Sequence, residues 1–531
     1  GYTRATGKIA MCIAQNGPGI TGLVTPVKTA YWNHTPMLLV TPQAANKTMG
    51  QGGFQEVEQM NLFKDMVCYQ EEVRDASRMA EVLNRVILKA KRGSAPAQIN
   101  VPRDFWTQVI DIELPSIIEF ERPSGGSTAI SEAADLLSNA KFPVILSGAG
   151  VVLADAIEDC KNIAEKLDAP VACGYQHNDS FPGKHPLAVG PLGYNGSKAA
   201  MEIISKADVV LALGTRLNPF STLPGYGIDY WPKEAKIIQV DINSDRIGLA
   251  KKITVGICGD AKLVAKQILS ELSPSAGDTG REDRKALIHQ TKSAWLQTLT
   301  SLDHEEDDEG TTWNKDSRER DPDRMSPRMA WRAIQAGLPE DAIISSDIGN
   351  NCAIGNAYPT FEQGRKYLAP GLFGPCGYGF PSVLGAKIGC PDTPVVGFSG
   401  DGAFGISMSE MTSCSREEWP NITMVIFRNY QWGAEKRNTT LWYDNNFIGT
   451  ELDPKLSYAK IAEACGFKGV KVTTQSELTE ALKTSCVEQM NGITTFIEVI
   501  LNQELGEPFR RDAMKAPVEV AGINSKDTVV Q

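Results

Sequence analysis

A glycine-rich turn near residue 400 carries residue types that could hold phosphate or a metal ion. Gly400, Gly402 and Gly405 match the GxGxxG pattern of dinucleotide-binding turns. Such a turn needs an acidic residue at the end of the following strand, where the acid binds the ribose hydroxyl. Here the acid, Asp401, lies inside the turn, where its charge would repel phosphate, and the next expected strand ends in Asn429. The glycine pattern alone therefore does not indicate a dinucleotide site.

A hydrated magnesium ion would resolve both conflicts, because magnesium prefers six oxygen ligands and often takes only one or two from protein. Asp401 and Asn429 lie 28 residues apart, which suits two adjacent parallel strands joined by a helix over 405–419. Both side chains would then project from the carboxyl edge of the sheet, where open α/β folds bind ligands. Taken singly, Asp401 also suits a helix N-cap and Asn429 a turn. The pair together favours a magnesium site.

The surrounding chain alternates strand and helix patterns, which is typical of α/β proteins with parallel sheets. We predict three doubly wound parallel-sheet domains at 1–118, 125–273 and 327–531, with a charged linker containing one helix at 274–326. The strands are expected within 8–19, 37–43 and 97–104, then within 142–150, 169–175, 207–216 and 235–243, and finally within 342–349, 393–402, 421–429 and 494–501.

Composition limits the function classes. A chain of 531 residues is too long for one core, since single cores rarely exceed about 300 residues. A net charge of −11 argues against nucleic acid as a partner, because phosphate-backbone binding needs clustered Lys and Arg. Eleven cysteines without a CxxC pair predict free thiols and a cytoplasmic location. No run approaches the roughly 18 apolar residues of a membrane span, so we expect no membrane partner.

The turn and the strand after it match a known motif. GDGAFG, followed after the expected helix by RNYQWG, resembles the thiamine diphosphate motif of the acetolactate synthase and pyruvate oxidase family. In that motif an aspartate, an asparagine and a backbone carbonyl two residues later hold the metal. The resemblance implies that Asp401, Asn429 and the carbonyl of Gln431 bind Mg²⁺, which in turn holds the diphosphate of the cofactor, thiamine diphosphate.

The resemblance extends along essentially the whole chain. GYTRATGK, QNGPGIT and GGFQEVEQ are similar to the pyrimidine-binding domain of that family, and SSDIGNN and GPCGYGFPSVLGAKIG to its diphosphate-binding domain. The family fold implies a pyrimidine domain, a middle Rossmann-like domain and a diphosphate domain, in that order. It also implies a homodimer or homotetramer with the active site between subunits. The cofactor-binding residues that it implies are Pro18, Asn350, Asn351, Gly374, Cys376, Gly400, Gly402 and Ala403.

Two features depart from the family pattern. The family glutamate that activates the cofactor lies shortly before the segment matching GYTRATGK, so no residue of this sequence is assigned that role and we expect a chain truncated at its N-terminus. Glu56 is the nearest early acid, but it lies in a different family segment. Cys376 occupies the position of the bulky apolar residue that bends the cofactor. Three interpretations stay open: the thiol of Cys376 is the wedge, a neighbouring residue is the wedge, or Cys376 is an inert core residue.

Particular stretches, among them those at 31–59 and 190–232, resemble family members that act on a two-carbon sulfonated aldehyde. The reaction implied releases sulfite and passes an acetyl group to phosphate, giving acetyl phosphate. A sulfonate and a phosphate need polar and cationic donors, and Arg suits both. The candidates are Gln55, Lys47, Arg437 and Arg511, with Lys436 and Arg510 as further cations. His34 could move a proton near the aldehyde, or could be a packed, hydrogen-bonded histidine.

Two alternatives stay open at this point. An acetolactate synthase would join two 2-oxo acids and bind FAD in the middle domain, where the expected strands could hold an adenine nucleotide or nothing. A non-catalytic relative would lack the activating glutamate altogether. A flavin absorbance spectrum separates the first alternative from the sulfite-releasing reaction, and sulfite release itself separates the second.

Overall fold

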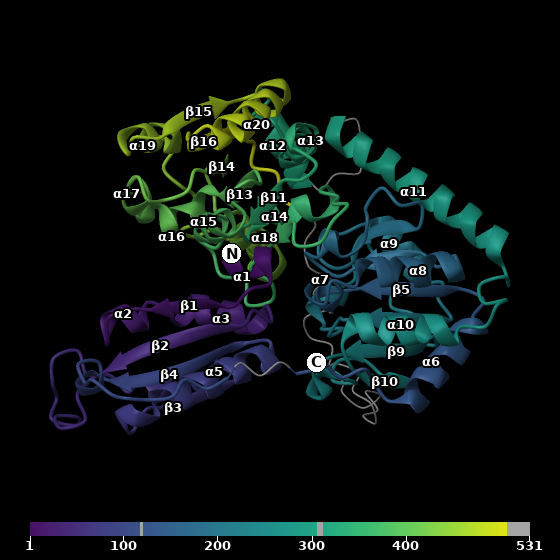
Figure 1. The fold of residues 1–531 in the computed structure, drawn as a ribbon. Coiled ribbons are helices and arrows are strands. Elements are labelled where there is room, and N and C mark those ends of the chain that lie inside the picture. Colours follow the sequence, from purple (N-terminus) through teal and green to yellow (C-terminus); the bar gives the residue numbers. More distant parts are fainter. Residues whose placement is uncertain (117–119, 305–311, 507–531) are drawn as a thin grey trace. The chain divides into compact units, whose positions relative to one another are not determined.

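The computed structural model of the chain forms two compact units, and we describe each by itself (Figure 1). The first unit comprises Gly1–Glu121 with the short segments Pro370–Pro375 and Ile388–Cys390, and the second contains the rest of the chain. Within the part that the structure describes, no helix has the length and apolarity needed to cross a bilayer. The residues described are 1–116, 120–304 and 312–506.

The first unit is built on one four-stranded parallel sheet with the strand order β1-β2-β4-β3. The central strands, β2 and β4, are buried along nearly their whole length, and both contribute apolar side chains to the core beneath α5. Helix α5 packs Val82, Val86 and Ala90 against the sheet at helical spacing. The strands are β1 (Ala10–Ile13), β2 (Met37–Gln43), β3 (Tyr69–Glu72) and β4 (Pro96–Pro102), and the helices are α1 (Tyr2–Thr6), α2 (Pro18–Thr21), α3 (Val24–Trp32), α4 (Gln59–Leu62) and α5 (Met79–Gly93).

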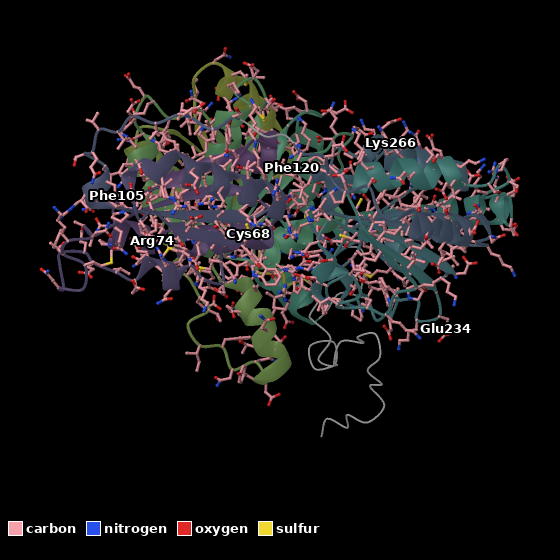
Figure 2. All side chains as sticks on the ribbon, turned by 60° about the horizontal axis from the view of Figure 1, so that its bottom comes forward. Cys68, Arg74, Phe105, Phe120, Glu234 and Lys266 are labelled. Atoms are coloured by element: carbon pink, nitrogen blue, oxygen red, sulfur yellow. The ribbon has the colours of Figure 1, made fainter. Side chains whose placement is uncertain are left out.

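The second unit begins with a six-stranded parallel sheet, which we call the middle sheet. Its order, β10-β9-β8-β5-β6-β7, runs outward in both directions from β5, as in doubly wound folds. Exposed side chains of both signs, such as Lys266 and Glu234 in Figure 2, surround it. The strands are β5 (Pro143–Ser147), β6 (Val171–Cys173), β7 (Ala188–Pro191), β8 (Val209–Leu213), β9 (Lys236–Asp241) and β10 (Val255–Cys258), and the helices are α6 (Ser127–Ser138), α7 (Ala149–Leu153), α8 (Ile157–Leu167), α9 (Lys198–Ile204) and α10 (Ala261–Glu271).

The expected linker contains a long helix, α11 (Arg281–His304), and a shorter one, α12 (Thr312–Arg320). Arg284, in the first turn of α11, is 1% exposed and binds the loops that precede β5 and β6 of the middle sheet. Its guanidinium donates to the backbone oxygens of Lys141, Leu167, Asp168, Gly277 and Thr279 at 2.8–2.9 Å. This part of the segment is therefore anchored rather than freely solvated. The domain boundaries themselves stay predictions.

The second unit ends with another six-stranded parallel sheet, which we call the third sheet, of order β12-β11-β13-β14-β16-β15. Trp331 on α13 packs 5.0 Å from Phe398 and 5.5 Å from Phe427, ring centre to ring centre, in its core. The strands are β11 (Ile343–Ser346), β12 (Tyr367–Leu368), β13 (Val395–Gly400), β14 (Thr423–Arg428), β15 (Lys468–Val472) and β16 (Thr495–Ile500), and the helices are α13 (Pro327–Gly337), α14 (Asn350–Ile354), α15 (Gly379–Gly389), α16 (Asp401–Ser407), α17 (Met411–Cys414), α18 (Gly433–Trp442), α19 (Tyr458–Ala464) and α20 (Gln475–Met490).

The predicted fold class, α/β with three parallel sheets, is confirmed, and β13 and β14 are adjacent and parallel as expected. Five strands were not predicted, namely β3, β7, β10, β12 and β15, and each lies at an edge of its sheet. Edge strands are covered on fewer sides and lack the long apolar run that marks a central parallel strand. The helix expected over 405–419 was misplaced, because it begins at Asp401 and is interrupted at Met408–Glu410.

Candidate metal and diphosphate site

Open space lies beyond the carboxyl ends of β11 and β13. A Cβ atom built on Gly349, which follows β11, or on Gly400, which ends β13, would meet no atom within 4 Å. The same is true of Gly405 on α16. Gly349 also has φ +120°, which side chains rarely adopt. Two neighbouring strand ends thus leave their backbone open to a ligand, in the manner of backbone cradles for phosphate.

The three predicted metal ligands converge at this edge. Asp401 and Asn429 are each 1% exposed, and β13 and β14 place them side by side. One atom of the Asn429 carboxamide lies 3.3 Å from Asp401 Oδ1 and 3.2 Å from the backbone oxygen of Gln431. With nitrogen at that position, the amide donates to both oxygens. With oxygen there, three oxygens face one another, an arrangement that fits oxygen ligands about 3 Å apart around Mg²⁺.

Asp401 is held in one orientation. Its Oδ2 accepts from Nη1 of Arg428 at 3.0 Å and from the backbone N–H of Tyr430 at 2.8 Å, while Oδ1 accepts from the N–H of Gly402 at 3.0 Å. Burial raises the pKa of Asp401 to about 6, against the lowering effect of Arg428. In the residues that the structure describes, no three His, Cys, Asp or Glu side chains gather as a metal-binding group, so this site offers a single carboxylate.

The two predicted asparagines of α14 have different surroundings. Asn351 Oδ1 accepts from Asn429 Nδ2 at 3.4 Å, which brings Asn351 to the metal-ligand cluster. Asn350 bonds instead to the end of the described chain. Its Nδ2 donates to the backbone oxygen of Glu504 at 2.9 Å, and its Oδ1 accepts from the N–H of Gly506 at 2.8 Å. Both residues are 4% exposed.

Asp347 is a residue that sequence reasoning missed. It is fully buried, and its carboxylate accepts from the N–H groups of Gly377 and Gly379 at 3.1 and 3.0 Å and from Ser399 Oγ at 3.0 Å. These bonds hold the loop that contains Cys376 against the ends of β11 and β13. Burial and then the nearby Asp347 raise the pKa of Cys376 to about 11, so its thiol is neutral at pH 7. The sequence signal that could have identified Asp347 is its position between the end of an expected strand and Gly349.

The other predicted residues of α16 are explained partly by packing. A Cβ atom on Gly402 would lie 2.9 Å from the ring of Trp432, so only glycine fits there. Ala403 is 4% exposed in the core of the helix.

Five predicted residues belong to the first unit, and four of them lie in its segment Gly1–Glu121. Pro18 opens α2, and a Cβ on the preceding Gly17 would lie 2.6 Å from the backbone oxygen of Gln55, so the two loops pack closely. The Gln55 side chain accepts from Gln15 at 2.7 Å. Lys47 is exposed. His34 follows α3 with φ +50° and is half-buried.

Gly374, which groups with the first unit, has φ +57°. The cations predicted at 510 and 511, Arg510 and Arg511, lie outside the described residues.

Helix α18 carries two buried cations with different partners. Lys436 is 6% exposed, forms an ion pair with Glu451 and donates to Gln431 Oε1 at 3.1 Å. Arg437 is 4% exposed and donates from Nη1 to Asn350 Oδ1 at 3.4 Å. The guanidinium of Arg437 also lies 4.6 Å from the ring centre of Tyr194. The structure therefore places Arg437 beside Asn350 of α14.

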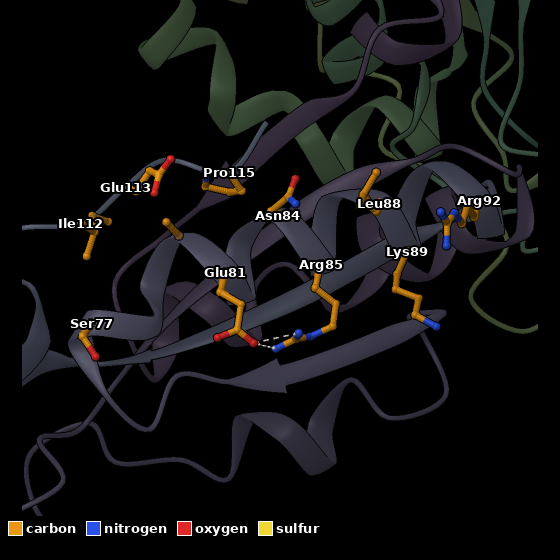
Figure 3. Close-up of a pocket in the computed structure, with 11 residues that line it drawn as sticks. Ser77, Glu81, Asn84, Arg85, Leu88, Lys89, Arg92, Ile112, Glu113 and Pro115 are labelled. Atoms are coloured by element: carbon orange, nitrogen blue, oxygen red, sulfur yellow. Dashed lines mark hydrogen bonds and ion pairs between the residues drawn. The ribbon is translucent and has the colours of Figure 1, made fainter. Parts of the chain in front are cut away.

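A cavity of about 450 Å³ lies along α5 in the first unit, and Figure 3 shows its lining. Arg85 is its central cation, but Arg85 pairs with Glu81 at 3.0 Å and with Glu71 at 2.8 Å. Arg92, also in the lining, lies 4.8 Å from the ring of Phe120, which Figure 2 labels. None of the predicted site residues within the described ranges lines this cavity.

Known proteins resemble this chain along nearly its whole length. Three family models match, described as the N-terminal TPP binding domain, the central domain and the C-terminal TPP binding domain of thiamine pyrophosphate enzymes, at residues 1–62, 130–268 and 347–499. A probable sulfoacetaldehyde acetyltransferase of Rhizobium meliloti (strain 1021) is 76% identical over 531 residues, which is 100% of this chain and 90% of that protein.

More relatives show where the chain falls among these enzymes. A sulfoacetaldehyde acetyltransferase of Roseovarius nubinhibens is 75% identical over 99% of this chain and 87% of its own length. A probable acetolactate synthase large subunit of Methanococcus aeolicus is 30% identical over 91% of this chain and 80% of its own length. The expected likeness to the family is confirmed, and thiamine diphosphate is its cofactor. The chain belongs to the thiamine pyrophosphate enzyme family.

Proposed function

We propose that this chain is a thiamine-diphosphate-dependent acyltransferase that converts sulfoacetaldehyde and phosphate to acetyl phosphate and sulfite, a step of sulfonate degradation. The observation that carries the proposal is the identity of 75–76% over nearly the whole chain with relatives named sulfoacetaldehyde acetyltransferase. The acetolactate synthase relative shares only 30%. The family membership and the site geometry support the cofactor, and the relatives support the substrate.

The proposed metal ligands are Asp401 Oδ1, Asn429 Oδ1 and the backbone carbonyl of Gln431. Their convergence supports a Mg²⁺ ion, the usual partner metal of the family, which would hold the cofactor's diphosphate over the open backbone at Gly349 and Gly400. When bound, thiamine diphosphate supplies a carbanion and an electron sink. The chain's own residues bind and orient the metal and the diphosphate, while the neutral thiol of Cys376 offers an apolar surface.

We propose Arg437 as the principal anion-binding residue for the sulfonate or the phosphate. Its planar guanidinium can bind either anion through two hydrogen bonds. Its contact with the Tyr194 ring and its hydrogen bond to Asn350 of α14 support this assignment. Lys436 is less suited, because Glu451 already pairs with it. Gln55, Lys47 and Arg511 stay candidates for the same substrates, and His34 for proton transfer.

The test follows sulfite release from sulfoacetaldehyde with and without phosphate, and measures acetyl phosphate in the same samples. We expect sulfite and acetyl phosphate in equal amounts, with both dependent on phosphate. Equal sulfite release without phosphate would contradict the transferase assignment. Acetolactate formed from pyruvate, together with a flavin absorbance band, would instead support the condensation reaction.

Enzymes of this family are typically oligomeric. We propose a homodimer or homotetramer with active sites between subunits, which light scattering of the purified protein distinguishes from a monomer. We also propose a cytoplasmic location, which is supported by eleven free cysteines.

No described residue is assigned the role of the activating glutamate. Exchange of the cofactor's acidic C2 proton, measured with the bound cofactor, tests whether the chain activates it, and exchange no faster than in water would support a non-catalytic relative.

A further inference from the structure

Arg428 is a fully buried cation directly behind the candidate metal site. It ends β14, its side chain is 0% exposed, and Nη1 lies 3.0 Å from Asp401 Oδ2. Its Nη2 donates to the backbone oxygens of Asp453 and Leu456. Its Nε lies 3.8 Å from Glu498 Oε1. The predicted site does not explain why a cation is buried at this position. Burying a charge costs free energy unless the charge is paired and hydrogen-bonded.

Aromatic rings fix the guanidinium in place. Its central carbon lies 4.4 Å from the ring centre of Tyr430 and 5.3 Å from that of Tyr458. The hydroxyl of Tyr458 donates to the backbone oxygen of Asp401 at 2.8 Å. The rings of Tyr430 and Tyr458 and the hydroxyl of Tyr458 therefore fix Arg428 and Asp401 relative to each other. The ion pair cannot rearrange without disturbing the core.

This geometry makes the two oxygens of Asp401 unequal. Each carboxylate oxygen has about two acceptor positions. Oδ2 fills both, with the Arg428 guanidinium and the N–H of Tyr430. Oδ1 accepts from the N–H of Gly402 and keeps one position, on the side where the Asn429 carboxamide lies. Only one oxygen of Asp401 is thus available to a cation.

We propose that Arg428 determines the metal selectivity of the site by restricting Asp401 to binding through one oxygen. Mg²⁺ needs near-octahedral geometry with single oxygens at 2.0–2.1 Å, whereas Ca²⁺ takes six to eight oxygens and readily binds a carboxylate through both. A carboxylate with one oxygen occupied favours the smaller ion. The inference rests on the proposed function, because it takes Asp401 as a ligand of the cofactor's metal.

A purely structural role for Arg428 makes a different prediction. Arg428 also compensates the buried Glu498, whose Oε2 accepts from Ser457 Oγ at 2.7 Å and from the N–H of Ala459 at 3.1 Å. If charge compensation were its whole role, loss of Arg428 would weaken binding of every metal by the same factor. The ratio of affinities for two metals separates the roles.

The experiment measures, by calorimetry, the affinity of metal-free protein for thiamine diphosphate in the presence of either Mg²⁺ or Ca²⁺. We expect the wild type to bind more tightly with Mg²⁺. In Arg428→Gln the ratio of Mg²⁺-supported to Ca²⁺-supported affinity should fall roughly tenfold, the scale of losses when an outer-shell partner is removed. Arg428→Gln alone leaves the buried carboxylates of Asp401 and Glu498 without the cation that pairs with both. The double variant Arg428→Gln/Glu498→Gln removes one charge of each sign, so it tests the same ratio without that repulsion.

Glu498→Gln alone is the matched control, because it leaves the Arg428 and Asp401 pair intact and should keep the wild-type ratio. An unchanged ratio in both Arg428 variants would overturn the inference while leaving the proposed metal site in place. Failure of the wild type to bind the cofactor with either metal would overturn the metal site, and the inference with it.

Discussion

The middle and third sheets share a parallel, six-stranded architecture, yet glycines have opposite effects at their carboxyl edges. At the middle sheet, a Cβ on Gly148 would lie 2.5 Å from the oxygen of Gly214, and one on Gly150 would lie 2.6 Å from its Cα. Glycines there close the gap between the ends of β5 and β8. At the third sheet, Gly349 and Gly400 face open space. Glycine therefore allows close backbone packing at the edge of the middle sheet and leaves space for a ligand at the edge of the third sheet.

The acids at the two edges differ in the same way. Asp241 ends β9 and accepts from the N–H of Asn243 at 2.9 Å, which is a local turn contact. Asp401 faces the Asn429 carboxamide and lies near the carbonyl of Gln431, so its surroundings provide several oxygens. A shared fold does not specify a shared site, because chemistry depends on the few side chains grafted onto the strand ends.

The largest expected effect comes from exchanging the two acids for amides. Asp401→Asn should weaken Mg²⁺-dependent binding of thiamine diphosphate by about 100-fold or more, because it removes the one carboxylate that we propose as a metal ligand. Asp241→Asn, the matched change at the middle sheet, should leave that affinity unchanged. Calorimetry of both proteins checks the pair, and near-UV circular dichroism checks that each is folded. Equal weakening in the two would remove the distinction between the edges.

Alanine substitutions at Gly150 and Gly400 should have different effects, the first on stability and the second on cofactor binding. Gly150→Ala should lower the free energy of unfolding by about 1–3 kcal/mol, because its methyl group would overlap Gly214. Gly400→Ala should change it by less than about 0.5 kcal/mol. Its methyl group should nonetheless weaken cofactor binding about tenfold, or 1.4 kcal/mol, by filling space that we assign to the diphosphate. Urea titrations and calorimetry measure the two effects, and undiminished cofactor affinity in Gly400→Ala would contradict that assignment.

Binding of the anionic substrates should also depend on the carboxyl edge of the third sheet. Arg437→Lys keeps the charge but loses the planar fork, so we expect the KM for sulfoacetaldehyde or for phosphate to rise about tenfold. Arg416→Lys, at an exposed position paired with Glu418, is the control and should behave as the wild type. Steady-state kinetics with each substrate varied in turn measures both. If neither KM changes in Arg437→Lys, the anions bind elsewhere.

The smallest expected effect is on the pH dependence of the protein's stability, through Asp241 at the edge of the middle sheet. Burial raises the pKa of Asp241 above its usual range. Its contribution to stability is therefore complete below the pKa of the unfolded chain and is lost as pH rises through the folded-state pKa. Asp241→Asn should gain stability relative to the wild type across that window. Unfolding curves at several pH values test the trend, and a constant difference would show that burial leaves this carboxyl unperturbed.

Prediction from sequence succeeded where a local pattern carries the information. Central strands such as β2 and β13 are buried on both faces, so their apolar runs could be recognised, whereas polar edge strands such as β3 could not. Asp401 and Asn429 were predicted as partners because their spacing implies adjacent strands. Asp347 and Arg428 were missed, since an acid or an arginine at the end of a strand usually faces solvent.

The sequence by itself determined the order of strands and helices and which residue types could bind a metal, because both follow from neighbours along the chain. Only the tertiary structure decided which charges are buried and with whom. Lys436 meets Glu451, whereas the adjacent Arg437 meets Tyr194 from the middle part of the chain. Such contacts join residues far apart in sequence, so they depend on how sheets and helices pack and not on any local pattern.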